Sequence, residues 1–568
     1  MRKAGMALLL LCGLAAGAVA APEIHVRLPG GSSLALAQTT EGLVRGVSDN
    51  AVKRFLGIPY AKPPVGNLRW MPPQPPDKWK VRDAKMFGPT CAQVTTLGPF
   101  AGPPNSNEDC LYLNVFAPAV VKDKLPVLVW IHGGGYFDGA SNDYDPTKLV
   151  TKGRLVVVTL NYRLNLFGFL AHPALDAEGH PGGNYGILDM QAALKWVQRN
   201  IAAFGGDPNN VTLGGQSAGA GATTANVLSP GAKGLFHRAI FQSGGYTPFV
   251  PKSIAEEKGK KFAAAAGCDS GDIAKCLRAL PAAKIEALAG TASETGPFIT
   301  NPMVDGTVIP QQEIDLIRAG AFNKMPIMMG TTHDEGNFNA GILQYFKKDR
   351  AALNETDYRG YLKRTYGGNA GPGGSPPAYP KDTMDKVMAR YPVSKAGAQM
   401  AWDSAHSDAL ACRGQYTAEA LSSHAPVYMY LFDDRTAQTY FPKMPGFQPL
   451  AYHTADIPYV FTGYHGGPNG LPFKLTPAQS QLSDSMVTAW ANFARSGNPN
   501  RREAAQGRPR QRLERPEPEA DAPWPRWKKG ADSEAYFLQK DGWKTVETNA
   551  QFAAAHNCSF WNTLLLYK

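Results

Sequence analysis

Short apolar runs separated by turn residues, and one long helical pattern, dominate the distribution of hydrophobic positions along this chain. The runs are rich in Val, Ile, Leu and Phe without strict alternation, which is typical of strands covered on both faces. We expect such strands at residues 111–116, 127–131, 155–160, 211–214, 239–242, 326–330 and 427–432. Apolar side chains recur at helical spacing over residues 184–204. Strands that alternate with helices predict an α/β fold with a mostly parallel sheet covered on both faces.

Two other stretches depart from this pattern. Residues 43–60 mix apolar and polar positions around two glycines, as a leading antiparallel ribbon would. Residues 501–521 consist mainly of arginines, acids and prolines, with almost no apolar residue larger than alanine. Such a segment cannot bury enough surface to fold, so we predict a disordered, solvated insertion whose charges nearly cancel. A role in binding a partner is the less favoured reading of the insertion.

Length and composition set broad limits on the class of protein. A chain of 568 residues suggests two to four domains by length alone. Its 43% hydrophobic and 18% charged residues fit a soluble globular protein. The formal net charge of +11 is spread along the chain without dense Lys/Arg blocks, which argues against nucleic acid as a partner.

The N-terminus has the features of a secretory signal over residues 1–20. Arg2 and Lys3 precede an apolar run, and Ala18-Val19-Ala20 supplies small residues for cleavage before Ala21. The apolar run is too short to span a bilayer comfortably. A lipid anchor at Cys12 is disfavoured, because Leu11 stands where a small residue is wanted. We therefore expect a secreted or periplasmic protein without a membrane span.

Of the seven cysteines, six lie beyond this signal. An even number in an exported chain suggests disulfides, although six cysteines allow fifteen pairings. Pairing neighbours in the sequence, apart from one long link to the C-terminus, would join Cys91–Cys110, Cys268–Cys276 and Cys412–Cys558. The chain has no C-x-x-C or clustered Cys/His spacing, so we expect no metal site.

A candidate nucleophile lies where the strand at 211–214 meets a run of small residues. Gly215, Ser217 and Gly219 form G-x-S-x-G, the strand-to-helix elbow that raises a serine hydroxyl above a sheet. Glycines are needed because a Cβ two residues from the serine would collide across the turn. A plain Gly/Ser turn before a helix is the alternative in a chain with 59 glycines. Other parts of the chain must therefore decide.

Candidate oxyanion donors follow the strand at 127–131. His132-Gly133-Gly134-Gly135 matches the H-G-G-G type of loop, whose bare amides can approach a reacting carbonyl. Gly134 and Gly135 would supply two such N–H groups, and Ala218, directly after the serine, a third. A flexible loop is the competing interpretation.

In this architecture the acid and then the histidine follow the serine along the chain. Asp334 and Glu335 both lie just after the strand at 326–330, and the residues alone do not choose between them. Later histidines are His406, His424, His453, His465 and His556. A loop position beyond the strand at 427–432 modestly favours His453, although any single histidine is more often structural.

Several segments resemble the type-B carboxylesterase family, the branch of α/β-hydrolases that includes cholinesterases and para-nitrobenzyl esterases. The resemblance is carried by residues 55–61, 108–115, 161–163, 205–208 and 241–244, and extends from about residue 43 to 561. It implies an α/β-hydrolase fold in one catalytic domain over residues 21–568, in place of the several domains suggested by length.

The resemblance also implies roles for individual residues. It assigns nucleophile, acid and base to Ser217, Glu335 and His453. It favours Gly134, Gly135 and Ala218 as oxyanion donors, and supports the cysteine pairings above. Ser243 resembles a serine that steadies the acid and the histidine from behind. The expected chemistry is hydrolysis of a small-molecule carboxylic ester through an acyl-enzyme, without cofactor.

Departures from the family pattern limit the substrate prediction. Gln216 precedes the serine where cholinesterases carry a glutamate, and residues 91–110 contain no tryptophan. Both weaken the case for a cationic choline ester. Phe338 and Phe249 are candidate pocket walls, with a plain core role as the alternative.

The sequence is compatible with two other functions. Non-catalytic relatives act as exported binding or adhesion proteins, but they lack members of the triad that this chain retains. The same serine chemistry would also serve a lactone, an amide or a polyester.

Overall fold

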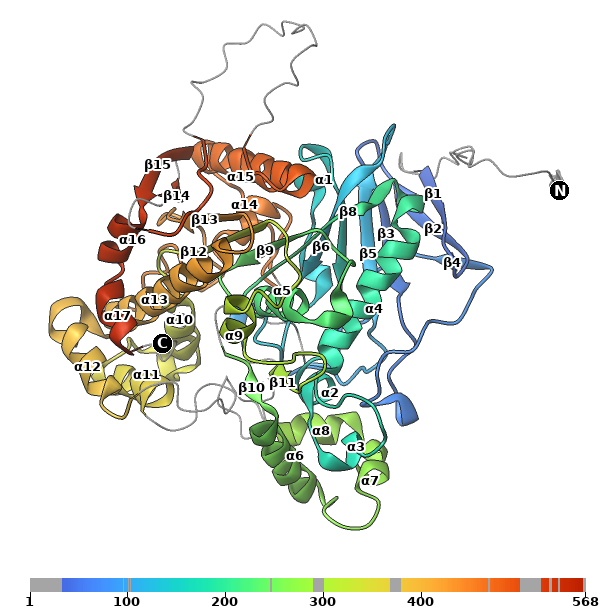
Figure 1. Ribbon diagram of the computed structural model, residues 1–568, viewed down its shortest axis with the longest axis horizontal. Coiled ribbons are helices and arrows are strands. Elements are labelled where there is room, and N and C mark those ends of the chain that lie inside the picture. The colour runs from blue at the N-terminus through green and yellow to red at the C-terminus, as the bar shows by residue number, and fades with distance from the viewer. Residues whose placement is uncertain are drawn as a thin grey trace, which may run out of the picture.

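One large sheet collects strands from nearly the whole chain (Figure 1). The computed structural model describes residues 33–94, 97–100, 102, 104–245, 248–289, 301–367, 380–467, 470–500, 523–530, 534–539 and 542–564. The predicted signal at 1–20 and the insertion at 501–521 lie outside these residues. The thirteen strands of the sheet run in the order β1-β2-β3-β5-β7-β6-β8-β9-β12-β13-β14-β15, with β4 pairing with β2.

The strands of this sheet have the following bounds: β1 (Ser33–Gln38), β2 (Leu43–Ser48), β3 (Val52–Pro59), β4 (Val81–Asp83), β5 (Tyr112–Pro118), β6 (Leu125–Ile131), β7 (Val156–Leu160), β8 (Gly206–Gln216), β9 (Arg238–Gln242), β12 (Ile327–Thr332), β13 (Val427–Phe432), β14 (Glu534–Gln539) and β15 (Gly542–Thr548). A separate pair consists of β10 (Val250–Pro251) and β11 (Met303–Val304).

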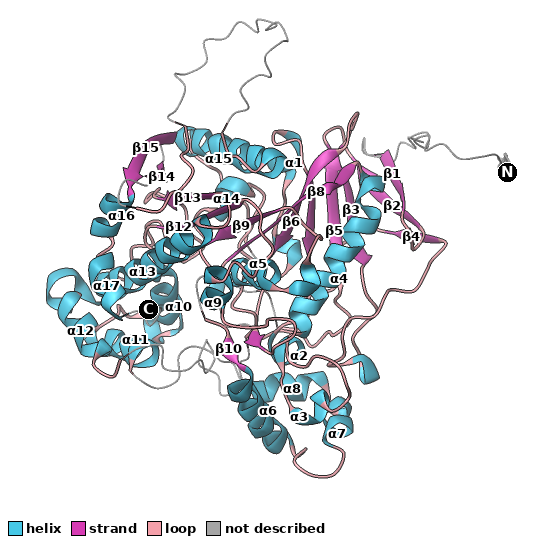
Figure 2. Ribbon diagram, in the orientation of Figure 1, coloured by secondary structure: helices cyan, strands magenta, loops and turns pink. Residues whose placement is uncertain are grey.

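The helices lie around the sheet (Figure 2). They are α1 (Thr147–Thr151), α2 (Asn165–Phe169), α3 (Pro173–Asp176), α4 (Tyr185–Asn200), α5 (Ala218–Leu228), α6 (Lys252–Ala266), α7 (Ile273–Ala279), α8 (Ala282–Ala289), α9 (Glu313–Arg318), α10 (Gly336–Phe346), α11 (Glu355–Tyr366), α12 (Thr383–Arg390), α13 (Val393–Ser422), α14 (Ile457–Val460), α15 (Pro477–Ser496), α16 (Asn549–Ala555) and α17 (Cys558–Leu564).

The parallel centre and the antiparallel edges of the sheet agree with the pattern of the sequence. Strands β7, β6, β8, β9, β12, β13 and β14 are mutually parallel, as expected from βαβ connections. The ribbon at 43–60 forms the antiparallel pair β2–β3. The predicted helix over 184–204 is α4 followed by a 3-10 turn, Ile201–Phe204. The fold class, an α/β-hydrolase with a large mixed sheet, is therefore confirmed.

Among the predicted strand boundaries, the start of β8 differs most from the structure. The apolar pattern predicts a strand only from residue 211, whereas β8 begins at Gly206. Gly206 pairs with Leu125 and Val211 with Val127, so residues 207–210 stand opposite Pro126 alone. The extra residues bulge out of the ladder, which keeps the turn-forming sequence but places it inside a strand.

Alternate side chains of the central strands divide the core into two layers. Val127, Val129 and Ile131 of β6 face one cluster, which α4 and α5 cover. Leu128 and Trp130 face the other cluster, which α15 covers. Burial on both faces explains why these strands read as continuous apolar runs in the sequence.

All six paired cysteines form the disulfides considered above, Cys91–Cys110, Cys268–Cys276 and Cys412–Cys558. The second lies in the group formed by α6, α7 and α8 at one end of the molecule, and the third joins α13 to α17 (Figure 1). A cross-link stabilises chiefly by restricting the unfolded chain, so the third, spanning 146 residues, restricts it most.

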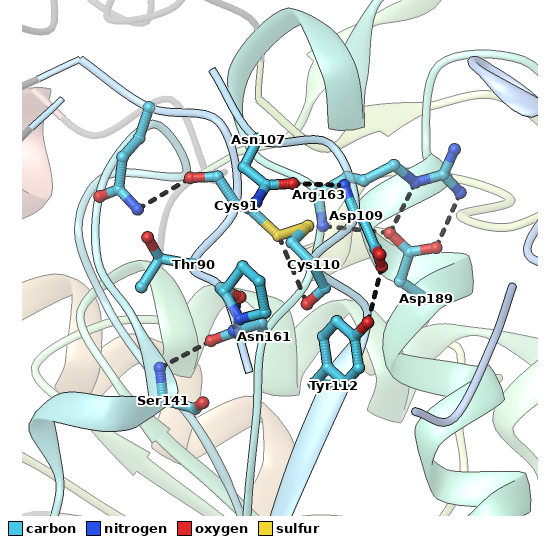
Figure 3. Close-up of a disulfide and its surroundings, with 12 residues drawn as sticks. Thr90, Cys91, Asn107, Asp109, Cys110, Tyr112, Ser141, Asn161, Arg163 and Asp189 are labelled. Atoms are coloured by element: carbon cyan, nitrogen blue, oxygen red, sulfur yellow. Dashed lines mark hydrogen bonds and ion pairs between the residues drawn. A yellow bond between two sulfur atoms is a disulfide. The ribbon is translucent and has the colours of Figure 1, made fainter. Parts of the chain in front are cut away.

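Figure 3 shows the first disulfide beside a buried ion pair. Arg163 donates through Nε and Nη2 to the two oxygens of Asp189, at 2.8 and 2.7 Å. Both side chains are buried, so this bidentate pair satisfies two charges that would otherwise be costly. Nearby, the Asn165 amide donates to the Tyr136 carbonyl at 2.7 Å. These contacts hold Arg163 to α4 and Asn165 to Tyr136, the residue that follows the loop at 132–135.

Candidate active site

The predicted nucleophile lies at a sharp bend between β8 and α5. Ser217 has φ 59° and ψ −126°, a conformation that costs a non-glycine residue about 1–3 kcal/mol. Its amide donates to the Gln242 carbonyl of β9 at 2.8 Å, which helps to hold the bend. A Cβ on Gly215 would lie 2.4 Å from the Gly219 backbone, and one on Gly219 2.1 Å from the Ile131 carbonyl oxygen. The elbow therefore requires both glycines.

The glycine loop after β6 lies against this bend. A Cβ added to Gly133 would lie 3.1 Å from the Cβ of Ser217. Gly134 and Gly135 have φ values of 102° and 61°, in the region that favours glycine. The loop therefore brings bare backbone close to the serine, as an oxyanion site needs. The oxyanion roles of Gly134, Gly135 and Ala218 remain predictions.

His132, the first residue of this loop, packs against the protein interior. Its ring stacks on Tyr162 with centroids 4.5 Å apart, and Nδ1 lies 2.8 Å from the Gly133 carbonyl oxygen. Burial lowers the pKa of His132 to about 4. This imidazole is therefore neutral at physiological pH, and its contacts assign it a packing role under the glycine loop.

The predicted acid and base are in direct contact. Oε2 of Glu335, after β12, bonds to Nδ1 of His453, and Oε1 accepts from the Thr332 amide at 2.8 Å. Burial acts to raise the pKa of Glu335, but neighbouring His453 and hydrogen bonding hold it below its usual value. The carboxylate is thus charged, and it can orient the ring and stabilise an imidazolium.

The other nitrogen of His453 points toward the elbow. Its Nε2 lies 3.1 Å from Nε2 of Gln216, the residue immediately before Ser217. An amide N–H can donate to Nε2 only when the imidazole carries its proton on Nδ1, toward Glu335. That tautomer is the one a general base requires, because Nε2 is then able to accept a proton.

The remaining histidines make other contacts. His406 is half-buried beside Tyr361, 3.1 Å from its hydroxyl, and desolvation lowers its pKa to about 4. His424 bonds to the Arg318 carbonyl at 3.3 Å. His465 bonds to the Gly467 carbonyl at 2.6 Å, and His556 to Asp408 at 3.0 Å. Among the five candidates, His453 is the one bonded to a carboxylate beside the elbow.

Ser243 lies behind the acid. It has φ 51°, follows β9 directly, and donates its amide to the Gly330 carbonyl at 2.8 Å. Its hydroxyl is buried and forms no full hydrogen bond within the described structure. It nevertheless acts to lower the pKa of Glu335, after the larger effects of burial and of His453. This placement agrees with the predicted steadying role, which stays a prediction.

Phe338 and Phe249 have different surroundings. The Phe338 ring lies 5.5 Å from the His453 ring and 4.8 Å from Phe100, which in turn lies 4.9 Å from Phe441. Phe249 instead packs in the large core cluster, and its backbone exchanges hydrogen bonds with Gln312 at 3.0 and 2.8 Å. Phe338 is thus an aromatic wall beside the predicted base.

The sequence did not single out Asp456, three residues after His453. It is fully buried, accepts from Gln242 at 2.8 Å and from the Tyr430 hydroxyl at 3.2 Å, and burial raises its pKa to about 6. Its position directly before the apolar residues of α14 could have indicated that Asp456 is buried. Aspartates are usually exposed, however, so the sequence offered little reason to expect it.

The described residues contain neither a metal-binding cluster nor a membrane-spanning helix. Over those ranges there is no group of three or more His, Cys, Asp or Glu side chains that could hold a metal ion. The helices observed there include none long and apolar enough to cross a membrane.

The fold and this site define an α/β-hydrolase of the serine type, and comparison with known proteins specifies the class. The chain belongs to the carboxylesterase family, whose profile matches residues 33–561. It is 36% identical over 474 residues to the para-nitrobenzyl esterase of Bacillus subtilis, covering 81% of this chain and 90% of that one. It is therefore a serine hydrolase that cleaves carboxylic esters.

Other similar proteins show the breadth of the family. The fumonisin B1 esterase of Sphingopyxis macrogoltabida is 36% identical over 481 residues, with 81% and 82% of the two chains covered. The acetylcholinesterase of Bungarus fasciatus is 32% identical over 515 residues, with 84% and 81% covered. A solved structure of a PNB esterase superimposes with TM-score 0.71 at 32% identity, covering 92% of this chain and 99% of that one.

The contact between Gln216 and His453 predicts a pH effect. In Gln216→Glu a carboxylate would face the imidazole and favour its protonated form, which cannot accept a proton. We expect the acid limb of the kcat/KM profile to move to higher pH by about one unit. The measurement is a pH–rate profile with a neutral para-nitrophenyl ester. Gln38→Glu, at an exposed position of β1, is the control. Superimposable profiles for Gln216→Glu and wild type would contradict the prediction.

Proposed function

We propose that Ser217, His453 and Glu335 form the catalytic triad of this esterase. His453 accepts the proton of Ser217 as the serine attacks the ester carbonyl, and Glu335 stabilises the resulting imidazolium. The alcohol leaves with a proton from His453, and water then cleaves the acyl-enzyme by the same route. The observation that supports this most is the contact of His453 with Glu335 on one side and with Gln216, next to Ser217, on the other.

The oxyanion would be held by amides of Gly134, Gly135 and Ala218. Each donor of this kind is typically worth about 10²–10³ in kcat. Support comes from the position of the glycine loop against Ser217 and from the location of Ala218 at the first turn of α5. The N-terminal end of a helix has unpaired N–H groups and a positive dipole end, and both favour an anion.

The nucleophile assignment has a direct test. Ser217→Ala should lower kcat for para-nitrophenyl butyrate by about 10⁴-fold or more, because the acyl-enzyme cannot form. The protein should stay folded, as judged by circular dichroism and thermal unfolding. Ser229→Ala, at a buried serine on the C-terminal side of α5, serves as the matched control and should remain active. Wild-type turnover by Ser217→Ala would refute the triad.

We propose neutral esters with an apolar or aromatic group as the preferred substrates. The residue before the serine is an uncharged amide, and the wall beside His453 is built from Phe338, Phe100 and Phe441. The para-nitrobenzyl esterase among the relatives, named for an aromatic ester, agrees with this proposal. A lactone, amide or polyester substrate would use the same triad, whereas a binding-only function would not explain its arrangement.

The aromatic wall predicts a change in selectivity. Phe338→Ala should raise kcat/KM for an ester with a bulky group, relative to the acetate of a small alcohol, by about tenfold. The ratio between two substrates is independent of the folded fraction, so a loss of stability does not obscure it. Phe346→Ala, an exposed phenylalanine at the end of the same helix, should leave the ratio unchanged. An unaltered ratio in Phe338→Ala would remove it from the pocket.

We also propose that the chain is exported and works as a single catalytic domain. The three disulfides favour an oxidising compartment, and one sheet contains both β1 and β15. Expression in a bacterium with a secretory pathway should yield a mature protein that begins at Ala21. N-terminal sequencing decides the point, because an exported protein that retains residues 1–20 would contradict cleavage.

A further inference from the structure

Two adjacent carboxylates follow β12, and they have different contacts. Each is about 1% exposed. Glu335 bonds to His453, as described above. Asp334 instead faces the segment that leads to His453 and the arginine that follows β13, Arg435. Strands β12 and β13 are neighbours in the sheet (Figure 1). The segment with Asp334, after β12, and the segment with Arg435, after β13, therefore leave the sheet side by side.

The segment that carries His453 has a strained backbone. Leu450 and Thr454, three residues before and one residue after His453, have φ values of 54° and 81°. Residues other than glycine rarely adopt such values, and they persist only where surrounding contacts fix the conformation. The position of the imidazole therefore depends on contacts that hold residues 450–454.

Asp334 supplies such contacts at Ala451, two residues before His453. The Asp334 amide donates to the Ala451 carbonyl at 3.0 Å. The Ala451 amide donates back to Oδ2 of Asp334 at 3.1 Å. Both backbone polar groups of Ala451 are thereby held by one residue, which is itself the neighbour of Glu335. A parallel bridge between Asp334 and Tyr452 continues the pairing toward His453.

Arg435 holds the Asp334 carboxylate in place. Its Nε lies 3.0 Å from Oδ2, and its Nη2 lies 2.6 Å from Oδ1. A two-point contact between planar groups fixes orientation as well as distance. Although burial acts to raise the pKa of Asp334, His333 and Arg435 hold it below its usual value. The carboxylate is charged and cannot turn away from Ala451 without breaking this pair.

We propose that Asp334 is a positioning residue for ester hydrolysis, joining the loop of the acid to the loop of the base so that Glu335 and His453 meet. This inference rests on the proposed triad and adds a residue that touches neither substrate nor reacting atoms. Loss of the Ala451 contact frees the strained segment, so the imidazole spends less time aligned with Ser217. A misplacement of about 1 Å can cost about 10²-fold in rate.

The main test compares two substitutions at the same position. Asp334→Ala removes the acceptor for the Ala451 amide, whereas Asp334→Asn keeps an oxygen there and loses the charge. With para-nitrophenyl butyrate we expect kcat of Asp334→Ala to fall about 10- to 100-fold, with KM within about twofold of wild type. Asp334→Asn should recover most of the lost kcat.

A matched control separates positioning from general stability. Asp49 accepts from the Ala51 and Val52 amides at 2.7 Å each and pairs with Arg54, in the turn between β2 and β3. As at Asp334, a carboxylate accepts from backbone amides and pairs with an arginine, but the site lies at the other end of the sheet. Asp49→Ala should lower the unfolding temperature and leave kcat and KM unchanged. An equal loss of kcat in Asp49→Ala and Asp334→Ala would overturn the proposal.

A spectroscopic readout reports on the acid–base contact directly. The proton between Glu335 and Nδ1 of His453 should give a low-field proton NMR signal in wild type and in Asp334→Asn. The signal should broaden or shift in Asp334→Ala. An Asp334→Ala variant with the wild-type signal and wild-type kcat would refute the positioning role, and so would equal losses of kcat in the Ala and Asn variants.

Two further variants keep the outcome decisive. If Asp334→Ala does not fold, Arg435→Ala replaces it, since the Arg435 side chain is 48% exposed. Arg435→Ala should reduce kcat several-fold at constant KM, and a wild-type kcat would count against the proposal. Ser217→Ala is measured alongside. Activity in Ser217→Ala refutes the proposed triad, whereas inactive Ser217→Ala beside fully active Asp334→Ala refutes only the role of Asp334.

Discussion

Parallel backbone pairing at the centre of the sheet is the constraint on which the site depends. Ile131 pairs with Gly215, Gln216 with Gln242, and Thr332 with Phe432. Because parallel strands end next to one another, the loops after them begin at the same edge of the sheet, where its carboxyl ends lie and where ligands of such sheets bind. The glycine loop, the elbow, the acid and the base leave the sheet at this edge, although they come from residues 132–135, 217, 335 and 453.

Burial then determines the chemistry at that edge. Glu335 is almost inaccessible, yet it stays charged because His453 and the Thr332 amide compensate for its desolvation. For His132 and the half-buried His406, desolvation outweighs the opposing effects of the Gly133 carbonyl and of Glu335, lowers their pKa values and favours their neutral forms. A charged carboxylate and two neutral imidazoles thus have different charge states near the site. Several strained residues, among them Ser217 and Ser243, lie at the same edge because the packed sheet holds them there.

Local signals in the sequence determined the fold class and the type of site. Continuous apolar runs predicted the central strands because both of their faces are buried, and G-x-S-x-G and H-G-G-G were readable because steric limits act over a few residues. Gly215 and Gly219 illustrate this, since each would collide with backbone if it carried a Cβ. The bulge at residues 207–210 escaped prediction, because it depends on the register against β6.

Apart from the family resemblance, only the tertiary structure distinguishes between equivalent side chains. Asp334 and Glu335 are indistinguishable by position in the chain without a family resemblance, and five histidines could follow them. The contact partner of His453 lies 118 residues away, and that of Gln216 lies 237 residues away. Contacts at such separations follow from strand order and crossover packing, which no local pattern encodes. The sequence by itself determined that a serine elbow and bare amides exist, and the assembled sheet decided which carboxylate and which imidazole meet.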